Sequence, residues 1–416
     1  MKKRILILII LLNTLTYSQY GWMIRGTGVD PGALVKGISF ADANNGMIVT
    51  SNFSGYKVYR TSNGGVSWTG QTLPTSNGMW AVKYFDPSTA VVCGASGSMY
   101  RTINGGTNWT QINVGGSYFL TALSFIDNNT GWVSGGPLKI MKTTNNGVNW
   151  VNQSEFSTYT YSSIHMVNAN TGFAADYFQR IVKTTNGGSN WLDVPGPAGF
   201  YELWGTYMTD GNTVYCCGEI GKIIKSTDQG ISWTVYNTFI QRDLYAIHFV
   251  NSNTGYCVGD SSLILRTSNS GLNWSVLSSP QGDVSSSSAL TCISFINANT
   301  GYLAGNDGTV LYTTSGGLTP FEPISSEIPE KFELKQNYPN PFNPETNIEF
   351  TLPESDYLKL SVFDITGKEI EMLVDQQLRS GTYKVLWNAS SYPSGVYFYS
   401  IYTKSFSVTR KMILTK

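Results

Sequence analysis

The sequence predicts an all-β protein: a seven-bladed β-propeller closed by an N-terminal outer strand, followed by a C-terminal immunoglobulin-like β-sandwich. Similar octapeptides recur along the chain, and their final tryptophans are 41, 41, 41, 42 and 41 residues apart, at Trp68, Trp109, Trp150, Trp191, Trp233 and Trp274. Four short strand patterns fit into each interval, which is typical of a propeller blade. The repeat stops near residue 320, and the alternating strands of a small sandwich begin after residue 336.

Each octapeptide is predicted to form a hairpin turn. In the first copy, Thr61–Trp68, we expect the side-chain oxygen of Asn63 to bond the backbone amides of the turn and Gly65 to adopt a positive φ. The tryptophan then begins the next strand with a large apolar anchor. The copy Ser226–Trp233 fits the Asp-box pattern of sialidase-like (BNR) propellers, and the other copies resemble it with Asn in place of Asp. We interpret these residues as repeat scaffolding.

The sixth repeat illustrates the other strands of a blade. A first apolar strand, a polar turn, a second strand and a third strand precede the octapeptide, at Ile247–Phe249, Asn251–Gly255, Tyr256–Gly259 and Leu263–Arg266. The third strand occurs seven times, but Pro320 stands where the seventh copy should have its tryptophan. The Trp-led segment Tyr20–Arg25 precedes any first strand, so we predict that it supplies the outer strand of the seventh blade. Such pairing would leave no free strand edge where the ring closes.

The predicted ring, residues 20–319, resembles the BNR-like propellers of the photosystem II assembly and stability factor family. In that family an arginine leads into a Thr-x-Asp-Gly-Gly-x-x-Trp turn. Three arginines match it, three lysines replace it and a tyrosine ends the series, at Arg60, Arg101, Arg266, Lys142, Lys183, Lys225 and Tyr312. The resemblance implies a propeller scaffold on which a secreted protein is free to bind a different ligand.

The N-terminal segment is predicted to direct export. Residues 1–19 read as a secretory signal peptide, because Lys2, Lys3 and Arg4 precede the apolar run Ile5–Leu12. This run is too short to span a bilayer, and no other apolar stretch approaches transmembrane length. We therefore expect delivery to the periplasm and no transmembrane segment.

The C-terminal segment resembles a second export signal. Residues 320–336 contain three prolines and no glycine, so we predict an extended linker there. Residues 337–416 resemble the type A C-terminal sorting domain of the type IX secretion system, through the motifs Asn337–Pro344, Phe350–Pro353, Val362–Gly367, Ser380–Tyr383, Ser394–Tyr399 and Lys411–Lys416. The resemblance implies that the type IX secretion machinery is a partner. It also implies removal of the tail and release or attachment at the cell surface.

Composition excludes several function classes. Lys and Arg together number 27, as do Asp and Glu, and no basic run follows the N-terminus, which argues against nucleic-acid binding. Five cysteines lie in strand-like segments and are predicted to pack as small apolar residues: Cys93, Cys216, Cys217, Cys257 and Cys292. The adjacent Cys216 and Cys217 are the pair to check for a disulfide. No metal-ligand spacing occurs, and no cofactor is predicted.

Catalytic constellations are weakly represented. His165 and His248 occupy the same first-strand position in two repeats and are predicted to pack. The repeated arginines are expected at the periphery of the ring, not in the cluster by which a sialidase binds a substrate carboxylate. The enzymatic alternative is glycoside hydrolysis by a pair of loop carboxylates, drawn from Asp176, Glu202, Glu219 and Asp260.

Aromatic residues gather instead in the loops of one predicted face, between the fourth and first strands and between the second and third. Rings with few charges beside them suit stacking on sugars or a protein contact. We therefore predict a non-enzymatic, surface-exposed module that binds a glycan or a protein, with the site residues Trp80, Tyr118, Phe119, Tyr159, Tyr161, Phe178, Tyr201 and Trp204. The alternative is that most of these rings fill the ring or pack between blades.

Overall fold

The computed structural model describes residues 21–416 except 52–56, 76, 137–138, 154–159, 179, 198, 200–201, 239, 278–287, 318–321, 326–328, 379 and 390–391. The predicted signal peptide and two predicted site residues, Tyr159 and Tyr201, lie outside the described residues. In the described part of the chain, no helix is long and apolar enough to cross a membrane.

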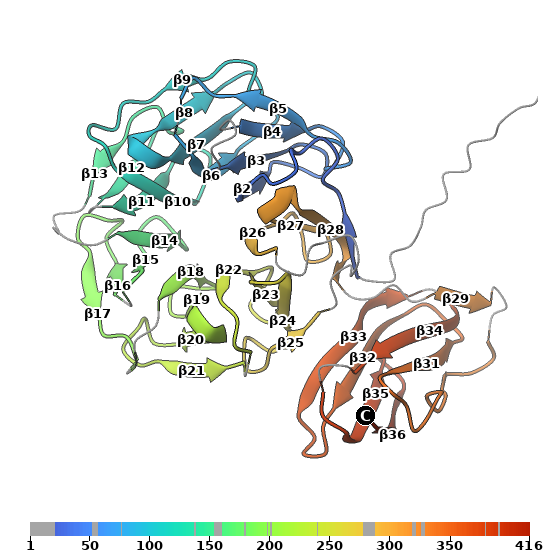
Figure 1. Cartoon of the computed structure of the whole chain (residues 1–416). Coiled ribbons are helices and arrows are strands. Elements are labelled where there is room, and N and C mark those ends of the chain that lie inside the picture. Colours follow the sequence, from blue (N-terminus) through green and yellow to red (C-terminus); the bar gives the residue numbers. More distant parts are fainter. Residues whose placement is uncertain are drawn as a thin grey trace, which may run out of the picture.

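The first three quarters of the chain form a ring of seven four-stranded antiparallel sheets (Figure 1). Blades one to three comprise β2(Val35–Phe40), β3(Gly46–Thr50), β4(Lys57–Thr61), β5(Thr69–Thr72); β6(Met79–Tyr84), β7(Ala90–Gly94), β8(Met99–Thr102), β9(Thr110–Gln111); β10(Phe119–Phe125), β11(Gly131–Gly136), β12(Lys139–Thr143), β13(Val151–Asn152). Blades four and five comprise β14(Tyr161–Met166), β15(Gly172–Asp176), β16(Ile181–Thr184), β17(Leu192–Val194); β18(Leu203–Met208), β19(Val214–Gly218), β20(Lys222–Ser226), β21(Thr234–Asn237). Blades six and seven comprise β22(Leu244–Phe249), β23(Gly255–Gly259), β24(Leu263–Thr267), β25(Ser275–Val276); β26(Leu290–Phe295), β27(Gly301–Gly305), β28(Val310–Gly317) and β1(Gly21–Ile24). Short 3-10 turns follow three second strands, at η1(Ala95–Gly97), η2(Glu219–Gly221) and η3(Asn306–Gly308).

Burial falls from the second strand of a blade to its outer strand. Every residue of β7 and of β27 is buried, whereas β5 and β9 are largely exposed. Neighbouring blades share apolar clusters, as where Trp68 of blade one packs with Tyr302 of blade seven. Because both faces of the second strand are covered, this strand is mostly apolar, whereas the outer strand is largely exposed and is anchored by the tryptophan that precedes it.

The predicted turns are present, with one feature that the sequence analysis missed. In the first turn, Asn63 Oδ1 accepts the amide of Ser67 at 3.0 Å, as expected. In addition, Thr61 Oγ1 accepts the amide of Gly65 at 2.9 Å. A hydroxyl occupies the position two residues before the Asn or Asp in every copy, so this repeated Thr or Ser was the available signal.

The ring closes as predicted. Strand β1 pairs antiparallel with β28, and the ring of Trp22 is fully buried, edge-on to Tyr256 and Phe295. Arg25 extends the closure, because its side chain stacks on Tyr312 and Nη1 donates to the carbonyl of Gly64 in blade one at 2.8 Å. The seventh blade therefore takes its outer strand from the opposite end of the domain.

The C-terminal part is a sandwich of two four-stranded sheets. One has the strand order β29(Glu322–Ser325), β34(Gly381–Asn388), β31(Glu345–Leu352), β30(Glu333–Leu334), and the other β33(Glu369–Leu378), β32(Asp356–Phe363), β35(Gly395–Tyr402), β36(Ser407–Leu414). A single apolar core that includes Trp387, Phe342 and Tyr399 fills the space between them. Strands β29 and β30 fall within the range predicted as a linker, so part of that range contributes edge strands to the sandwich.

Candidate ligand-binding face

Each innermost strand carries a bulge near its start, at the second residue in six blades and at the third residue of β10 in blade three. The register of the pairing shifts there in all seven blades, for example between Leu120 and Ala122. A bulge leaves the extra residue unpaired and redirects its side chain. The seven residues at this position are Lys36, Trp80, Thr121, Ser162, Trp204, Tyr245 and Thr291.

In blades three, four and seven the bulged residue joins its blade to the next one. Thr121 Oγ1 donates to the carbonyl of Tyr161 at 2.5 Å, and Ser162 Oγ donates to that of Leu203 at 2.6 Å. Thr291 makes the equivalent bond across the ring closure, to the carbonyl of Val35 at 2.5 Å. A buried carbonyl without a donor is costly, so these hydroxyls have a structural role.

Blades two and five satisfy the same carbonyl with a different atom. The thiol of Cys93 lies 3.9 Å from the carbonyl of Leu120, and that of Cys217 lies 3.5 Å from the carbonyl of Leu244. Both cysteines are free and fully buried, and burial raises the pKa of each thiol, so each keeps its proton for donation. The prediction that they are buried is confirmed, and they also act as inter-blade donors.

The second residue of the innermost strand in these two blades is tryptophan. Because a thiol from the adjacent strand donates to the next blade, Trp80 and Trp204 are not needed for that bond. Both are partly exposed, unlike the fully buried Trp22. Their rings contact neighbouring aromatics instead: Trp80 lies 6.0 Å from Phe119, and Trp204 lies 4.9 Å from Tyr245, between ring centroids.

We call Trp80, Phe119, Trp204 and Tyr245 the aromatic face. Phe119 is 50% exposed. Tyr245 is fixed by a hydrogen bond of 2.9 Å from its hydroxyl to Asp260 Oδ1, and burial together with this carboxylate raises the pKa of Tyr245. Tyr245 was not among the predicted site residues, although it is the bulged residue of its innermost strand, as Trp80 and Trp204 are of theirs. Lys36 occupies that position too, and burial lowers the pKa of its ammonium group.

Blade four departs from the others at the end of its second strand. Asp176 stands where five blades have glycine, and its Oδ1 accepts the amides of Phe178 at 2.7 Å and Arg180 at 2.8 Å. This bonding shapes a loop on which Phe178 is 60% exposed, in keeping with its predicted place in the site. Tyr161, which pairs with Asp176 in the sheet, is fully buried, so the prediction that it contacts a ligand is wrong. It packs in the core between blades three and four.

Tyr118 is also largely structural. Its carbonyl accepts the amide of Gly97 at 2.5 Å, and its ring packs beside the core of blades two and three. Of the described site residues that the sequence predicted, Trp80, Tyr118 and Trp204 are partly exposed, Phe119 and Phe178 are exposed, and Tyr161 is fully buried. Apart from Tyr118, the accessible rings lie in two aromatic pairs and one loop.

The carboxylates that the sequence offered as a catalytic pair make hydrogen bonds within the protein. Asp176 is fully buried, and burial raises its pKa, while Asp260 accepts the bond from Tyr245. Glu219 Oε2 accepts the amide of Glu202 at 3.3 Å. These roles are typical of residues that fix turns.

The histidines also pack between blades. His165 Nδ1 accepts the amide of Met208 in the next blade at 3.2 Å. Burial lowers the pKa of His165 to about 3 and that of His248 to about 4, so both rings are neutral at physiological pH. Within the residues that the structure describes, no group of three or more His, Cys, Asp or Glu side chains is placed to hold a metal ion.

Two family models match the chain. The model for secretion system C-terminal sorting domains matches residues 336–415, and the model for the photosynthesis system II assembly factor YCF48 matches residues 232–331. Curated protein sequences include no match. The first match indicates export to the cell surface or into the medium.

Several solved structures share the fold. YCF48 bound to a D1 peptide is 18% identical with a TM-score of 0.60, covering 72% of this chain and 96% of its own. YCF48 from Cyanidioschyzon merolae is 16% identical with a TM-score of 0.58, covering 70% and 98%. PorZ, a surface component of the type IX secretion system of Porphyromonas gingivalis, is 13% identical with a TM-score of 0.56; the match covers 91% of this chain and 59% of PorZ. The chain therefore joins a propeller similar to that of YCF48 to a C-terminal segment that matches the secretion system sorting domains.

Proposed function

We propose that the protein is an exported, non-enzymatic binding module whose aromatic face holds an extended segment of a partner protein. The observation that carries this proposal is the replacement of a hydroxyl by a thiol in blades two and five. In these blades Cys93 and Cys217 provide the inter-blade donor, and the position that makes this bond in blades three, four and seven carries Trp80 or Trp204. Large amphipathic rings that remain partly exposed are typical of protein contact sites.

The position of the two aromatic pairs favours an extended ligand. Trp80 and Phe119 belong to β6 and β10, across the ring from β18 and β22, which carry Trp204 and Tyr245 (Figure 1). A ligand that contacts both pairs has to reach across the ring. A polypeptide does so with alternate side chains, and the YCF48 structure with a bound D1 peptide is an example of a similar propeller with a peptide ligand.

The experiment compares two probes on the purified full chain, a displayed library of linear peptides and a glycan array. We expect peptides with apolar or aromatic residues to be enriched. The double variant Trp80→Ala/Trp204→Ala should weaken the selected peptide by about 2 kcal/mol or more, which is about 30-fold in Kd.

Ile231→Ala is the matched control, because Ile231 is 80% exposed on a turn at the outer rim of blade five. It should leave Kd unchanged. Equal binding by the double variant and the wild type would remove the aromatic face from the site. Enrichment of glycans without peptides would replace the protein ligand by a carbohydrate on the same rings.

A further inference from the structure

The outer rim of the propeller carries a repeated cation. In blades two to five a cation at the third strand donates to a turn carbonyl of the next blade, as Arg101 does to Asn146 at 2.9 Å and Lys225 to Ser270 at 2.7 Å. Arg266 holds the same position in blade six. These cations are half-buried in the other blades, whereas Arg266 is 6% exposed. Something additional covers blade six.

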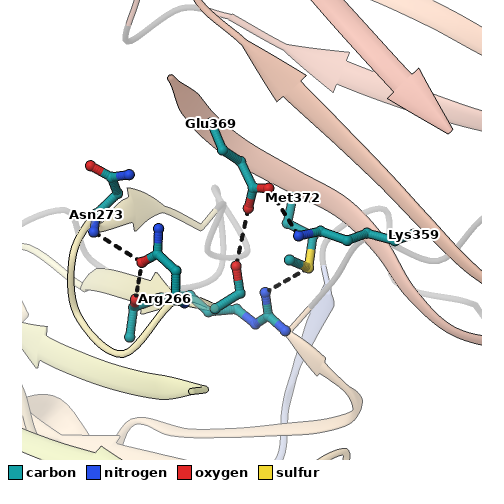
Figure 2. A network of polar contacts seen from close by, with 8 residues as sticks. Arg266, Asn273, Lys359, Glu369 and Met372 are labelled. Carbon is teal, nitrogen blue, oxygen red and sulfur yellow. Dashed lines mark hydrogen bonds and ion pairs between the residues drawn. The ribbon is translucent and has the colours of Figure 1, made fainter. Parts of the chain in front are cut away.

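The cover is the C-terminal sandwich. Arg266 Nη1 donates to Sδ of Met372 on β33 at 3.3 Å, over 106 residues of sequence (Figure 2). Ser268 Oγ donates to Glu369 Oε1 at 3.1 Å, and the other oxygen of Glu369 pairs with Lys359 at 2.9 Å. The carboxylate is therefore held between the rim of the propeller and its own domain.

Two strand edges meet at this contact. Strand β25 is the outermost strand of blade six, and β33 is an edge strand of its sheet in the sandwich. The two lie side by side, with a small polar crevice between them that Asn269, Ser275 and Glu371 help to line. Exposed strand edges are prone to pair with other chains, so covering one edge with another protects both.

We infer that the rim of blade six is a docking surface for β33 of the same chain, through which the sorting domain and the propeller travel as one rigid unit. The chemistry of the surface suits its occupant, since a guanidinium faces a polarisable thioether and a hydroxyl faces a carboxylate. Blade one offers an internal comparison, because residues 60–63 repeat the sequence Arg-Thr-Ser-Asn of residues 266–269. Ser62 is exposed, so the same tetrapeptide in blade one is not covered by the sandwich.

The test measures the distance between the two domains in the full chain. Spin labels are attached through Ile231→Cys in blade five and Ile365→Cys in the sandwich, two positions that are 80% and 73% exposed. The native cysteines are all buried, so only the introduced ones react. We expect a single narrow distance distribution.

Ser268→Arg places a bulky cation against Arg266 and should abolish the narrow distribution, whereas the matched variant Ser62→Arg should retain it. A thermal melt shows whether Ser268→Arg folds. If it does not, Glu369→Gln replaces it, and this variant should broaden the distance distribution to a smaller extent. A broad distribution in the parent, or a narrow one in both Ser268→Arg and Glu369→Gln, would overturn the docking.

Discussion

Blades three and five solve the same packing problem with different atoms. In blade three the hydroxyl of Thr121 donates to the next blade, and in blade five the thiol of Cys217 does so from the adjacent strand. The acceptor is the equivalent carbonyl in both cases. Blade five is thereby free to carry Trp204 where blade three needs a hydroxyl. In blade five, the change of donor from one strand to the next thus frees the position of Trp204 from the inter-blade bond.

The largest expected effect separates tryptophans that hold the ring from those of the aromatic face. Trp22→Ala removes a fully buried ring at the closure and should lower the free energy of unfolding of the propeller by about 3–5 kcal/mol. Trp204→Ala should cost much less, because Trp204 is partly exposed. Thermal and denaturant unfolding of the two variants measure the difference. Equal losses would mean that Trp204 is as structural as Trp22, and a neutral Trp22→Ala would show that the ring closes without β1.

Much of the ring was predictable because its signals are local and repeated. The spacing of the tryptophans predicted the blades, and Pro320 in place of a seventh tryptophan predicted closure by the segment around Trp22. The bulge was not predictable, since alternation along a strand does not show where one residue is unpaired. For that reason Tyr245 was missed and Tyr161 was wrongly assigned to the ligand.

The contact between Arg266 and Met372 could not be predicted for a different reason. It joins residues 106 positions apart in two domains, and the sequence motif of neither domain predicts a contact with the other. Only the packing of the two domains brings them together. The tetrapeptide at residues 60–63 shows this directly, because it has the same sequence as residues 266–269 and is not covered by β33.

A second inter-blade bond differs between blades three and four in a way that makes the stability of the ring depend on pH. The residue three positions after the bulge accepts an amide of the next blade, through Ser124 Oγ for Met166 in blade three and His165 Nδ1 for Met208 in blade four. The pKa of His165 is lowered to about 3 and that of His248 to about 4, against about 6.5 in the unfolded chain. Below pH 6.5 the unfolded chain therefore binds more protons than the folded one, and stability falls as pH falls towards these lowered values.

Between pH 7 and pH 5 we expect a loss of about 4 kcal/mol in the free energy of unfolding from the two histidines together, about 2 kcal/mol from each. Denaturant unfolding across this range measures it. The double variant His165→Ser/His248→Ser should flatten the slope, because serine fills the same position in blade three without titrating. A slope that persists in this variant would assign the pH dependence to other groups.

The smallest expected effect tests the thiol itself. Cys217→Ala removes the donor to the carbonyl of Leu244 and leaves a small void, so we expect a loss of about 1 kcal/mol in the free energy of unfolding. Cys217→Ser restores a donor on a shorter side chain and should recover part of that loss. The comparison with blade three sharpens the test. Thr121→Val removes a hydroxyl that donates to the carbonyl of Tyr161 and lies 3.1 Å from that of Ser134, so it should cost more than Cys217→Ala. If Cys217→Ser is less stable than Cys217→Ala, the thiol stabilises the ring through apolar packing alone. The thiol would then not explain why blade five has a tryptophan, Trp204, in place of a hydroxyl donor.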